Sequence, residues 1–360
     1  MYKILLLPGD GIGPEVIDQA VKVLRAVGQR FGIEFSFKKE LIGGAAMDVH
    51  GIPLKPEVID EAKASDAVLL GAVGDPKYDD PKASARPEQG LLAIRKGLEL
   101  FANLRPVKLF DQLVGASPVK ADVVRGTDML FVRELTGGLY FGRPSETRET
   151  AEGAVAVDTM VYSEKEIERV IRMAFELARG RRKHLTSVDK ANVLENSRLW
   201  RRVAERIGAQ HPDVALEHML VDSCSMRLIK SPRDFDVIVI ENTFGDILTD
   251  EASQVAGSMG MLPSASLGYG RLGLYEPIHG SAPRHAGKNT INPLATILSA
   301  AMMLRHSFGL SEAAGAVEKA VESAVADGIR TQDIWEEGMT RTGTAEMGDA
   351  VAKRVLSAVS

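Results

Sequence analysis

The chain of 360 residues carries a formal net charge of −5 and a single cysteine, Cys224. An acidic chain whose only basic run is Arg179-Gly-Arg-Arg-Lys183 offers no broad cationic surface to nucleic acid or to an anionic membrane. One cysteine excludes an intrachain disulfide and favours a reducing compartment, so we expect a cytoplasmic protein. The longest apolar stretch, 294–304, contains two hydroxyl residues and is too short to span a bilayer.

Strands and helices alternate along the first hundred residues. Apolar patterning and glycine turns predict strands at 2–7, 34–39 and 67–70 and helices at 14–31, 55–64 and 89–100. This alternation is typical of a parallel α/β sheet with helices on its faces. Because the chain is long for one hydrophobic core, we expect two lobes.

The middle of the chain has a different pattern. A strand at 128–135 and a glycine turn lead into extended pieces at 140–161, which carry a polar, charged tip at 145–152. Such a β-arm has exposed edges, and a partner subunit is the simplest cover for them. Further elements are predicted as helices at 164–178 and 193–207 and strands at 184–188 and 215–220. The segment 256–292 is rich in glycine and proline, and helices at 293–306 and 311–325 close the chain.

Two carboxylates, Asp246 and Asp250, follow the apolar run 236–240, which we interpret as a buried strand. We expect Gly245 to end this region and a helix to begin at Asp246. Residues at i and i+4 of a helix share a face, so the two carboxylates point the same way. A divalent cation such as Mg²⁺ or Mn²⁺ would relieve their repulsion. The alternative is a pair of solvated carboxylates favoured by the helix dipole.

Two glycine-rich segments are candidates for cofactor binding. The first, Gly9-Asp-Gly-Ile-Gly13, follows a strand and opens a helix, but Pro14 stands where the dinucleotide fingerprint needs glycine. A classical Rossmann site is therefore not expected there. The second, His279-Gly-Ser-Ala-Pro-Arg-His-Ala-Gly-Lys288, has small residues that let backbone approach a large ligand. Its alternative interpretation is an ordinary surface loop.

Seven ordered motifs together resemble the β-decarboxylating dehydrogenases, the family of isocitrate and isopropylmalate dehydrogenases. They are Gly9-Asp-Gly-Ile-Gly-Pro-Glu15, Leu100-Phe-Ala-Asn-Leu-Arg-Pro106, Val132-Arg-Glu-Leu-Thr-Gly-Gly-Leu-Tyr-Phe-Gly142, Val188-Asp-Lys-Ala-Asn-Val193, Phe244-Gly-Asp-Ile-Leu-Thr-Asp250, Gly260-Met-Leu-Pro-Ser-Ala-Ser266 and His279-Gly-Ser-Ala-Pro283. The resemblance implies a two-lobed α/β fold with parallel and mixed sheets that is not a classical Rossmann fold. The implied cofactor-binding lobe comprises 1–100 and 257–360, and the implied dimerisation and catalytic lobe comprises 101–256, with the β-arm at about 140–161.

The resemblance also implies a shared active site in a homodimer. One Mg²⁺ or Mn²⁺ would be held by Asp246, Asp250 and Asp222 of the partner subunit. Lys190 of the partner subunit would take the proton of the C2 hydroxyl, and Tyr140 would protonate the enol after loss of CO₂. The substrate carboxylates would bind to Arg95, Arg105 and Arg133, with Asp222 also near the substrate. The implied cofactor site contains Asn192, His279, Gly280, Ser281, Ala282, Pro283, Arg284 and Asn292.

The helix before Arg95 bears on the substrate. The resemblance places Glu88, Leu91 and Leu92 around the variable C3 group, with Val193 of the partner subunit opposite. A leucine pair buries an isopropyl group, worth about 2 kcal/mol, but would leave a third carboxylate unpaired. We therefore expect 3-isopropylmalate, the substrate of the oxidising step of leucine biosynthesis. Homoisocitrate, tartrate and isocitrate are the alternatives, and Leu91 and Leu92 could instead be core positions of an amphipathic helix.

The cofactor choice depends on Arg284. In NAD-using members of the family an aspartate stands at this position and binds the adenosine ribose, and an arginine would instead attract a 2′-phosphate. NADP use is therefore an alternative to NAD. The carboxylates of 343–349, where NADP-using relatives have a tyrosine and an arginine, favour NAD. A non-catalytic regulatory subunit of the same fold is the remaining alternative, and the presence of all five catalytic and metal residues argues against it.

Overall fold

The computed structural model describes residues 1–80 and 85–357. The chain divides into two compact units. Unit 1 comprises Met1–Leu100, Phe110–Pro118 and Ala256–Ser360, and unit 2 comprises Phe101–Leu109 and Val119–Val255. The segment 110–118, which the sequence assigned to the second lobe, thus belongs to unit 1. Here it contains the 3₁₀ turn η2 (Asp111–Ala116), and Arg330 donates to the carbonyl of Gln112 at 3.3 Å.

The main sheet of unit 1 has the strand order β2-β1-β3-β12-β11. All pairs are parallel except β11 with β12, which are antiparallel. Every residue of β3 is buried, as expected for a strand covered on both faces. The bounds are β1 (Tyr2–Gly9), β2 (Phe35–Lys39), β3 (Ala67–Ala72), β11 (Pro263–Leu267) and β12 (Gly273–Pro277).

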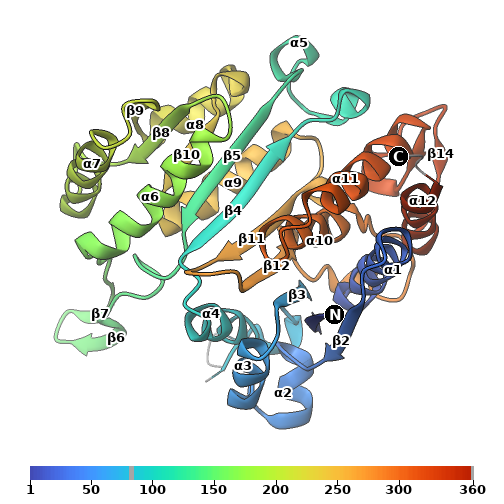
Figure 1. Cartoon of the computed structure of the whole chain (residues 1–360). Helices are drawn as coiled ribbons and strands as arrows, with labels where there is room; N and C mark the ends of the chain where they lie inside the picture. The colour runs from blue at the N-terminus through green and yellow to red at the C-terminus, as the bar shows by residue number, and fades with distance from the viewer. Residues whose placement is uncertain (81–84, 358–360) are drawn as a thin grey trace. The chain divides into compact units, whose positions relative to one another are not determined.

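Helices of unit 1 cover this sheet (Figure 1). Helix α1 begins with Pro14 in its first turn, where the missing N–H costs nothing, and ends at Gly32 in the left-handed region. It packs on α12 and α10, and α10 packs on β11 and β12. The helices are α1 (Gly13–Phe31), α2 (Gly44–His50), α3 (Pro56–Lys63), α4 (Glu88–Gly97), α10 (Leu294–His306), α11 (Ser311–Ala326) and α12 (Thr344–Ser357), and a short parallel pair joins β13 (Ile329–Arg330) to β14 (Thr340–Arg341).

Unit 2 contains the strand order β4-β5-β10-β8-β9. The pair β4–β5 is antiparallel and the other pairs are parallel. The capping box of Ser163 and Glu166 starts helix α6, which packs on α7, while α8 packs on α9. The bounds are β4 (Ala102–Lys108), α5 (Ala121–Val124), β5 (Asp128–Glu134), α6 (Glu164–Arg179), β8 (His184–Asp189), α7 (Glu195–Gly208), β9 (Ala215–Leu220), α8 (Val221–Lys230), β10 (Val237–Ile240) and α9 (Asn242–Val255).

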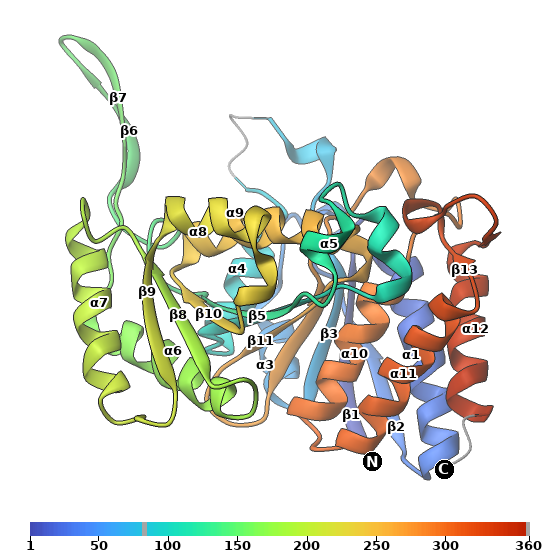
Figure 2. The same cartoon turned by 90° about the horizontal axis from the view of Figure 1, so that it is seen from above.

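The β-arm of unit 2 is an antiparallel pair, β6 (Ser145–Thr150) and β7 (Gly153–Asp158). All six residues of β6 and five of the six in β7 are exposed, including the apolar Val155. Figure 2 shows the pair extending away from the helices and sheet of its own unit. An isolated two-stranded ribbon has little stability in water, so its length and exposure favour a partner that covers it.

The α/β fold with parallel and mixed strands is as predicted, and two local predictions were wrong: the break at Gly245 and the two helices that close the chain. Helix α9 begins at Asn242, so Gly245 lies inside it rather than ending the preceding region. Gly245 is needed there for space, because a Cβ would lie 2.8 Å from Cγ of Arg133. The segment 256–292 contains β11 and β12, and α12 follows the two helices that were expected to close the chain. Helix α8 and strand β4 were also missed.

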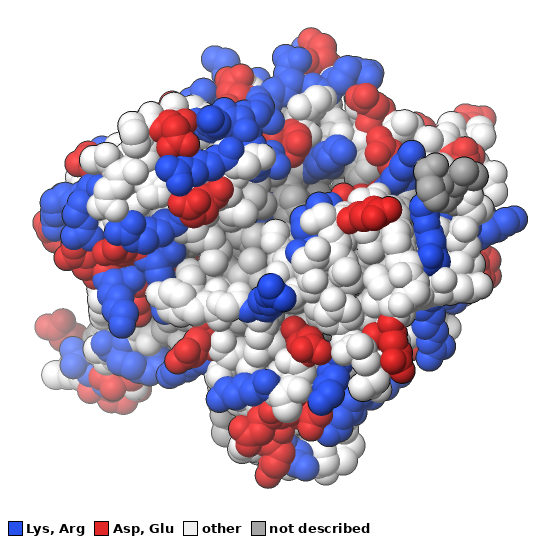
Figure 3. Space-filling view, in the orientation of Figure 1, with Lys and Arg blue, Asp and Glu red and all other residues white. Residues whose placement is uncertain are grey.

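In the view of Figure 3, basic and acidic side chains are interspersed over the molecule. None of the helices within 1–80 and 85–357 is long and apolar enough to cross a membrane.

Candidate functional site

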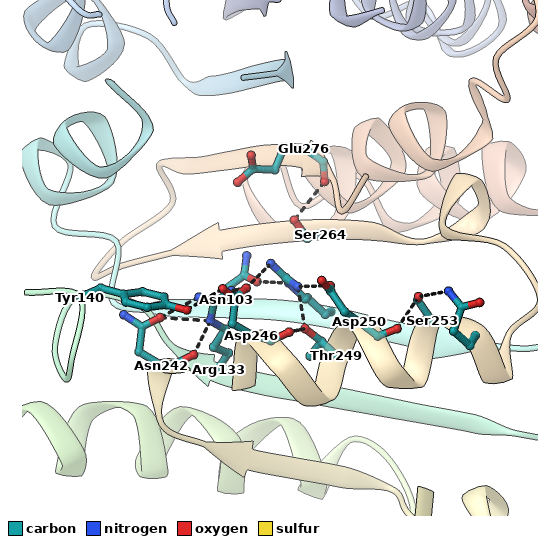
Figure 4. A network of polar contacts seen from close by, with 12 residues as sticks. Asn103, Arg133, Tyr140, Asn242, Asp246, Thr249, Asp250, Ser253, Ser264 and Glu276 are labelled. Carbon is teal, nitrogen blue, oxygen red and sulfur yellow. Dashed lines mark hydrogen bonds and ion pairs between the residues drawn. The ribbon is translucent and has the colours of Figure 1, made fainter. Parts of the chain in front are cut away.

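Arg133, at the end of β5, is the centre of a charged network in unit 2 (Figure 4). Its side chain is almost fully buried, and its Nη1 lies 2.5 Å from Oδ1 of Asp246. Its Nε and Nη2 donate to the side-chain oxygen of Asn242 at 3.1 and 2.8 Å, and Nε also donates to the Asn242 carbonyl at 2.9 Å. The guanidinium is therefore fixed in orientation by the first residue of α9.

Arg105, on the neighbouring strand β4, extends this network along α9. It donates to Asn103 at 2.7 Å and to the hydroxyl of Thr249 at 2.6 Å. Its guanidinium lies 3.8 Å from Asp246 and 3.6 Å from Asp250. The two arginines thus supply positive charge beside both carboxylates, so the i, i+4 spacing of the aspartates does not by itself require a metal ion.

Tyr140 joins the cluster from the loop after β5. Its hydroxyl donates to Oδ2 of Asp246 at 3.0 Å, on the oxygen that Arg133 does not bind. Burial and the adjacent Asp246 carboxylate raise the pKa of Tyr140 to about 12. The phenol is 41 % exposed, so it can reach a ligand while it keeps its proton at neutral pH.

A second polar pair of unit 2 links Lys190 to Asp222. The Nζ of Lys190 lies 2.6 Å from Oδ1 of Asp222, and this hydrogen bond lowers the pKa of the Asp222 carboxyl. Asp222 is in the first turn of α8, and Lys190 follows β8. Asn192 and Val193 follow in the same turn, and both are exposed.

The three predicted metal ligands are not assembled within one chain. Across residues 1–80 and 85–357, no group of three or more His, Cys, Asp or Glu side chains is arranged to hold a metal ion. Asp222 is bonded to Lys190, whereas Asp246 is bonded to Arg133 and Tyr140. Asp250 is left with one arginine 3.6 Å away, and burial together with Asp246 raises the pKa of its carboxyl. Asp246 and Asp250 are hard oxygen donors, which suit Mg²⁺ or Mn²⁺.

The predicted substrate helix is α4 of unit 1. Arg95 is buried and pairs with Glu276 of β12 at 2.6 Å. Leu91 and Leu92 are half-buried, so neither is a full core residue, while Glu88 is exposed in the first turn. A Cβ at Gly74 would lie 3.3 Å from the Glu88 carboxylate and 3.4 Å from Oγ of Ser281. Helix α4 and the second glycine-rich loop therefore approach each other across Gly74.

The second glycine-rich loop borders a cavity of about 510 Å³ within unit 1, a volume typical of small-molecule sites. Four predicted cofactor residues line it: His279, Gly280, Ala282 and Asn292. Pro283 and Arg284 are exposed in the same loop, and Ser281 is buried behind it. Asn192 belongs to unit 2 and is not a lining residue.

The first glycine-rich segment, 9–13, packs against the second glycine-rich loop and hydrogen-bonds to it. The N–H of Ile12 donates to the carbonyl of Ser281 at 2.9 Å. Gly11 has φ +56°, and a Cβ there would lie 2.1 Å from the same carbonyl oxygen, so only glycine fits. The N-terminal motif is thus part of the cavity wall through Ile12, although it lacks the dinucleotide fingerprint.

Two lining side chains are fixed by buried contacts. Asn292 accepts from the N–H of Leu294 at 3.0 Å, which caps α10, and donates to Asp333 at 3.0 Å. His279 faces the Gly280 carbonyl through Nδ1 at 3.0 Å, while its Nε2 is buried without a partner in the described structure. Burial lowers the pKa of His279, so the ring is neutral at pH 7.

The sequence did not predict several residues of the Arg133 network and of the cavity in unit 1. Asn103 lies inside the motif 100–106 and Asn242 lies two residues before the motif 244–250, but only the structure shows that both accept hydrogen bonds from the arginines. Glu276 carried no local signal. The missed cavity residues come from four stretches of the chain and are Ile12, Ser258, Gly260, His285, Thr290, Ile291, Gln332 and Asp333.

Comparisons with known proteins agree with this architecture. Residues 3–351 match the family model described as isocitrate/isopropylmalate dehydrogenase, and the chain belongs to this family. It is 60% identical over 355 residues to 3-isopropylmalate dehydrogenase of Geobacillus kaustophilus, covering 99% of this chain and 96% of the relative. It is 57% identical over 359 residues to the enzyme of the same name from Dehalococcoides mccartyi, covering 98% of each.

A solved structure gives the same result for the fold. The crystal structure of isocitrate dehydrogenase from Methylococcus capsulatus superposes with a TM-score of 0.87 at 35% identity, covering 99% of this chain and 100% of that one. Members named for two different substrates thus share this fold, so the choice of substrate depends on the site.

Proposed function

We propose that the protein oxidises and decarboxylates 3-isopropylmalate to 4-methyl-2-oxopentanoate and CO₂ with reduction of NAD, a step of leucine biosynthesis. The observation that carries the reaction type is the meeting of the Tyr140 phenol and the Arg133 guanidinium on the carboxylate of Asp246. The relatives named 3-isopropylmalate dehydrogenase, at 57% and 60% identity, support the substrate.

Three arginines would bind the two substrate carboxylates. A guanidinium presents paired N–H donors that match a carboxylate and does not lose its proton. Arg105 and Arg133 are held by amide and hydroxyl groups as well as by carboxylates, so they are oriented before substrate arrives. Arg95 is held by Glu276. Preorientation of this kind reduces the entropy cost of binding.

Proton transfers would be divided between two side chains. Lys190 of the partner subunit would accept the proton of the C2 hydroxyl as hydride leaves C2. Tyr140, which holds its proton at neutral pH because its pKa is about 12, would protonate C3 after CO₂ departs. Asp246, Asp250 and Asp222 of the partner subunit would hold a divalent cation, which would supply a Lewis acid for the C2 oxygen, and the bound cofactor would supply the hydride acceptor.

Sharing of the site between subunits is supported by the separation of the two polar pairs and by apolar exposure. Lys190 and Asp222 bind each other within one chain, while Tyr140 binds Asp246. Helices α8 and α9 pack together and expose Met226, Ile229 and Ile247 by 66 %, 41 % and 62 %. Large apolar side chains exposed on packed helices, together with an exposed β-arm, are typical of an obligate subunit interface.

The isopropyl group would lie against Leu91 and Leu92. Both leucines are half-buried in α4, so they have apolar surface left to cover, and the helix also carries Arg95. Isocitrate would place a third carboxylate against this surface, where no guanidinium of α4 other than Arg95 is available. The cost of an unpaired buried charge exceeds the gain from burying an isopropyl group.

Cofactor choice is proposed as NAD with relaxed selectivity. Arg284 is exposed in the loop that borders the cavity, and the neighbouring His285 contacts the hydroxyl of Thr290 at 3.3 Å. Arginine cannot accept hydrogen bonds from ribose hydroxyls but pairs with phosphate. Glu346 lies in the adjacent cavity with Arg341, so the phosphate side is not uniformly cationic.

The test of substrate and cofactor is an assay of absorbance at 340 nm with Mn²⁺, offering 3-isopropylmalate or isocitrate with NAD⁺ or NADP⁺. Turnover of 3-isopropylmalate supports the leucine pocket. Turnover of isocitrate alone would overturn it, and turnover of neither would favour homoisocitrate, tartrate or a regulatory subunit. Loss of turnover after chelation by EDTA, with recovery on adding Mn²⁺, is expected for a metal-dependent reaction.

The role of Arg284 is tested by Arg284→Asp. The ratio of kcat/KM for NAD⁺ to that for NADP⁺ is expected to rise by about tenfold or more, because one charge-assisted contact is replaced by a repelled one. Lys288→Asp, which changes an exposed cation four residues further along the loop, is the matched control and should leave the ratio near its original value. An unchanged ratio in Arg284→Asp would remove Arg284 from cofactor selection.

A further inference from the structure

Tyr162 occupies a buried polar cluster that the proposed chemistry does not use. Its hydroxyl lies 3.2 Å from Oε2 of Glu134 and 3.3 Å from Oε2 of Glu241, and it accepts from the N–H of Asn242 at 3.0 Å. Glu134 ends β5 and Glu241 follows β10, and these two strands are parallel neighbours. One phenol therefore connects the ends of two strands to the start of α9.

The carboxylates of the cluster also accept from backbone: Gly137 N–H donates to Oε2 of Glu134 at 2.8 Å, and Thr243 N–H donates to Oε2 of Glu241 at 3.0 Å. The hydroxyl has one proton to donate and already accepts from Asn242. Burial raises the pKa of both Glu134 and Glu241, and the backbone hydrogen bonds that each carboxylate accepts oppose this shift. Arg169 of α6 is the cation that faces Glu134, at 3.4 Å, and Arg133 is the cation whose charge acts on Glu241.

Glu241 and Tyr162 together cap helix α9. Its first N–H, from Asn242, is bound by the Tyr162 hydroxyl, and the next two, from Thr243 and Phe244, are bound by the carboxylate of Glu241. The N-terminal N–H groups of a helix have no partners within the helix, so these contacts fix its end. Asp246 and Asp250 lie about one and two turns further along the same helix.

The ring of Tyr162 also shapes the chain that leads to Tyr140. A Cβ on Gly137 would lie 2.6 Å from the ring, and a Cβ on Gly138 would lie 2.5 Å from its hydroxyl oxygen. Gly138 donates to the carbonyl of Val161 at 3.1 Å. The turn therefore runs closely over the ring, and both partners in the Tyr140–Asp246 contact are positioned by the same side chain.

We propose that Tyr162 is a positioning residue, whose hydroxyl and ring set the relative position of Tyr140 and of the Asp246 and Asp250 carboxylates. This inference rests on the proposed function only in assigning catalysis to Tyr140 and metal binding to the aspartates. If Tyr162 only filled space, replacing it with phenylalanine would leave metal binding and catalysis unchanged. The ring packs edge-on against Trp200 with centroids 6.1 Å apart, and phenylalanine would preserve that packing.

The test is Tyr162→Phe in the full-length protein, with Tyr275→Phe as the matched control. Tyr275 is also a buried tyrosine, but its hydroxyl contacts Ser307 of unit 1 at 2.7 Å and no residue of the cluster. Mn²⁺ binding is measured by calorimetric titration without substrate, and kcat and the KM values are then measured with 3-isopropylmalate and NAD⁺. Thermal unfolding reports the folded fraction of each variant.

For Tyr162→Phe we expect the Kd for Mn²⁺ to rise several-fold and kcat to fall by about tenfold or more, since small displacements of catalytic groups are costly. The KM for NAD⁺ is expected to stay within about twofold, because the proposed cofactor cavity lies in unit 1. Tyr275→Phe should leave Mn²⁺ binding and kcat near wild type. Unchanged Mn²⁺ affinity and kcat in folded Tyr162→Phe would overturn the inference.

A second variant covers the case in which Tyr162→Phe does not fold. Glu134→Gln keeps the shape of the cluster but replaces one acceptor with an amide, so a smaller change in the same direction is expected, and wild-type values in both readouts would overturn the inference. Because Mn²⁺ binding is measured without substrate, failure of the wild-type protein to turn over 3-isopropylmalate would contradict the proposed function and leave the positioning role testable.

Discussion

The network around Arg133 and the cavity beside His279 are built from different parts of the chain. In the network, every group that faces a ligand is a charged or phenolic side chain, and each is fixed by another side chain. The cavity wall includes Gly260, Gly280 and Ala282, and its buried histidine, His279, is neutral at pH 7. A small charged ligand is bound by a few hydrogen-bonding side chains held in fixed orientations. A large ligand needs a wall of small residues that lets the backbone come close.

Within unit 2, the Arg133 network and the Lys190–Asp222 pair also differ in how much each contributes to stability as well as to function. Arg133 is buried and binds the first residue of α9, so its loss should reduce both catalytic activity and the free energy of unfolding. The Lys190–Asp222 pair is partly exposed, so its loss should affect chemistry more than stability. The following changes test these differences in order of expected size.

Asp246→Asn is expected to have the largest effect. Asp246 contacts Arg133, Arg105 and Tyr140, and its carboxylate is a proposed metal ligand. We expect kcat to fall by about 10²–10³-fold, the size seen when one electrostatic group is removed from an active site. Calorimetric titration should also show weakened Mn²⁺ binding, and retained Mn²⁺ affinity would contradict the ligand assignment.

A mixed dimer makes the same variant a test of the shared site. Asp246→Asn and Asp222→Asn are each expected to be inactive, but unfolding and refolding them together should form dimers with one intact site. Statistical mixing predicts recovery of about a quarter of wild-type activity. No recovery, with mixed dimers demonstrated by tagged subunits, would mean that the two aspartates serve one site within the same chain.

Arg133→Met and Lys190→Met compare a buried with an exposed cation in the same unit. Both should reduce kcat by about 10²-fold or more. Only Arg133→Met should lower the free energy of unfolding, by about 2 kcal/mol, because it leaves the buried side-chain oxygen of Asn242 without its donor. Urea unfolding measures this. Equal destabilisation by both substitutions would show that the two pairs do not differ as described.

His279→Asn probes the cavity, where the expected effect is smallest. Burial holds the pKa of His279 below its ordinary value, so its contribution to stability is present above the ordinary histidine pKa and lost as pH falls through the lower folded value. The unfolding free energy of the wild type should therefore decline more than that of His279→Asn as pH falls from 7 to 5. His285→Asn, an exposed position in the same loop, is the control and should follow the wild type.

Much of the fold was predictable because it depends on local patterns. The strand at Tyr2, the proline at the start of α1 and the capping box of Ser163 and Glu166 are signals carried by neighbouring residues. Prediction of α9 was wrong at its start because Gly245 was interpreted as a break. The residue is glycine because the Arg133 side chain packs against it, which only the tertiary structure shows.

The candidate site, like the fold, was predictable only where it depends on local sequence. The sequence by itself determined the residue types, their order in the motifs and the shared helix face of Asp246 and Asp250. Only the tertiary structure decided that Arg105 and Arg133 lie beside those carboxylates, because parallel pairing brings the end of β5 next to the start of α9. It also decided the contacts of Tyr162, since hydrogen bonds between residues about eighty positions apart follow from how strands are arranged and leave no trace in local spacing.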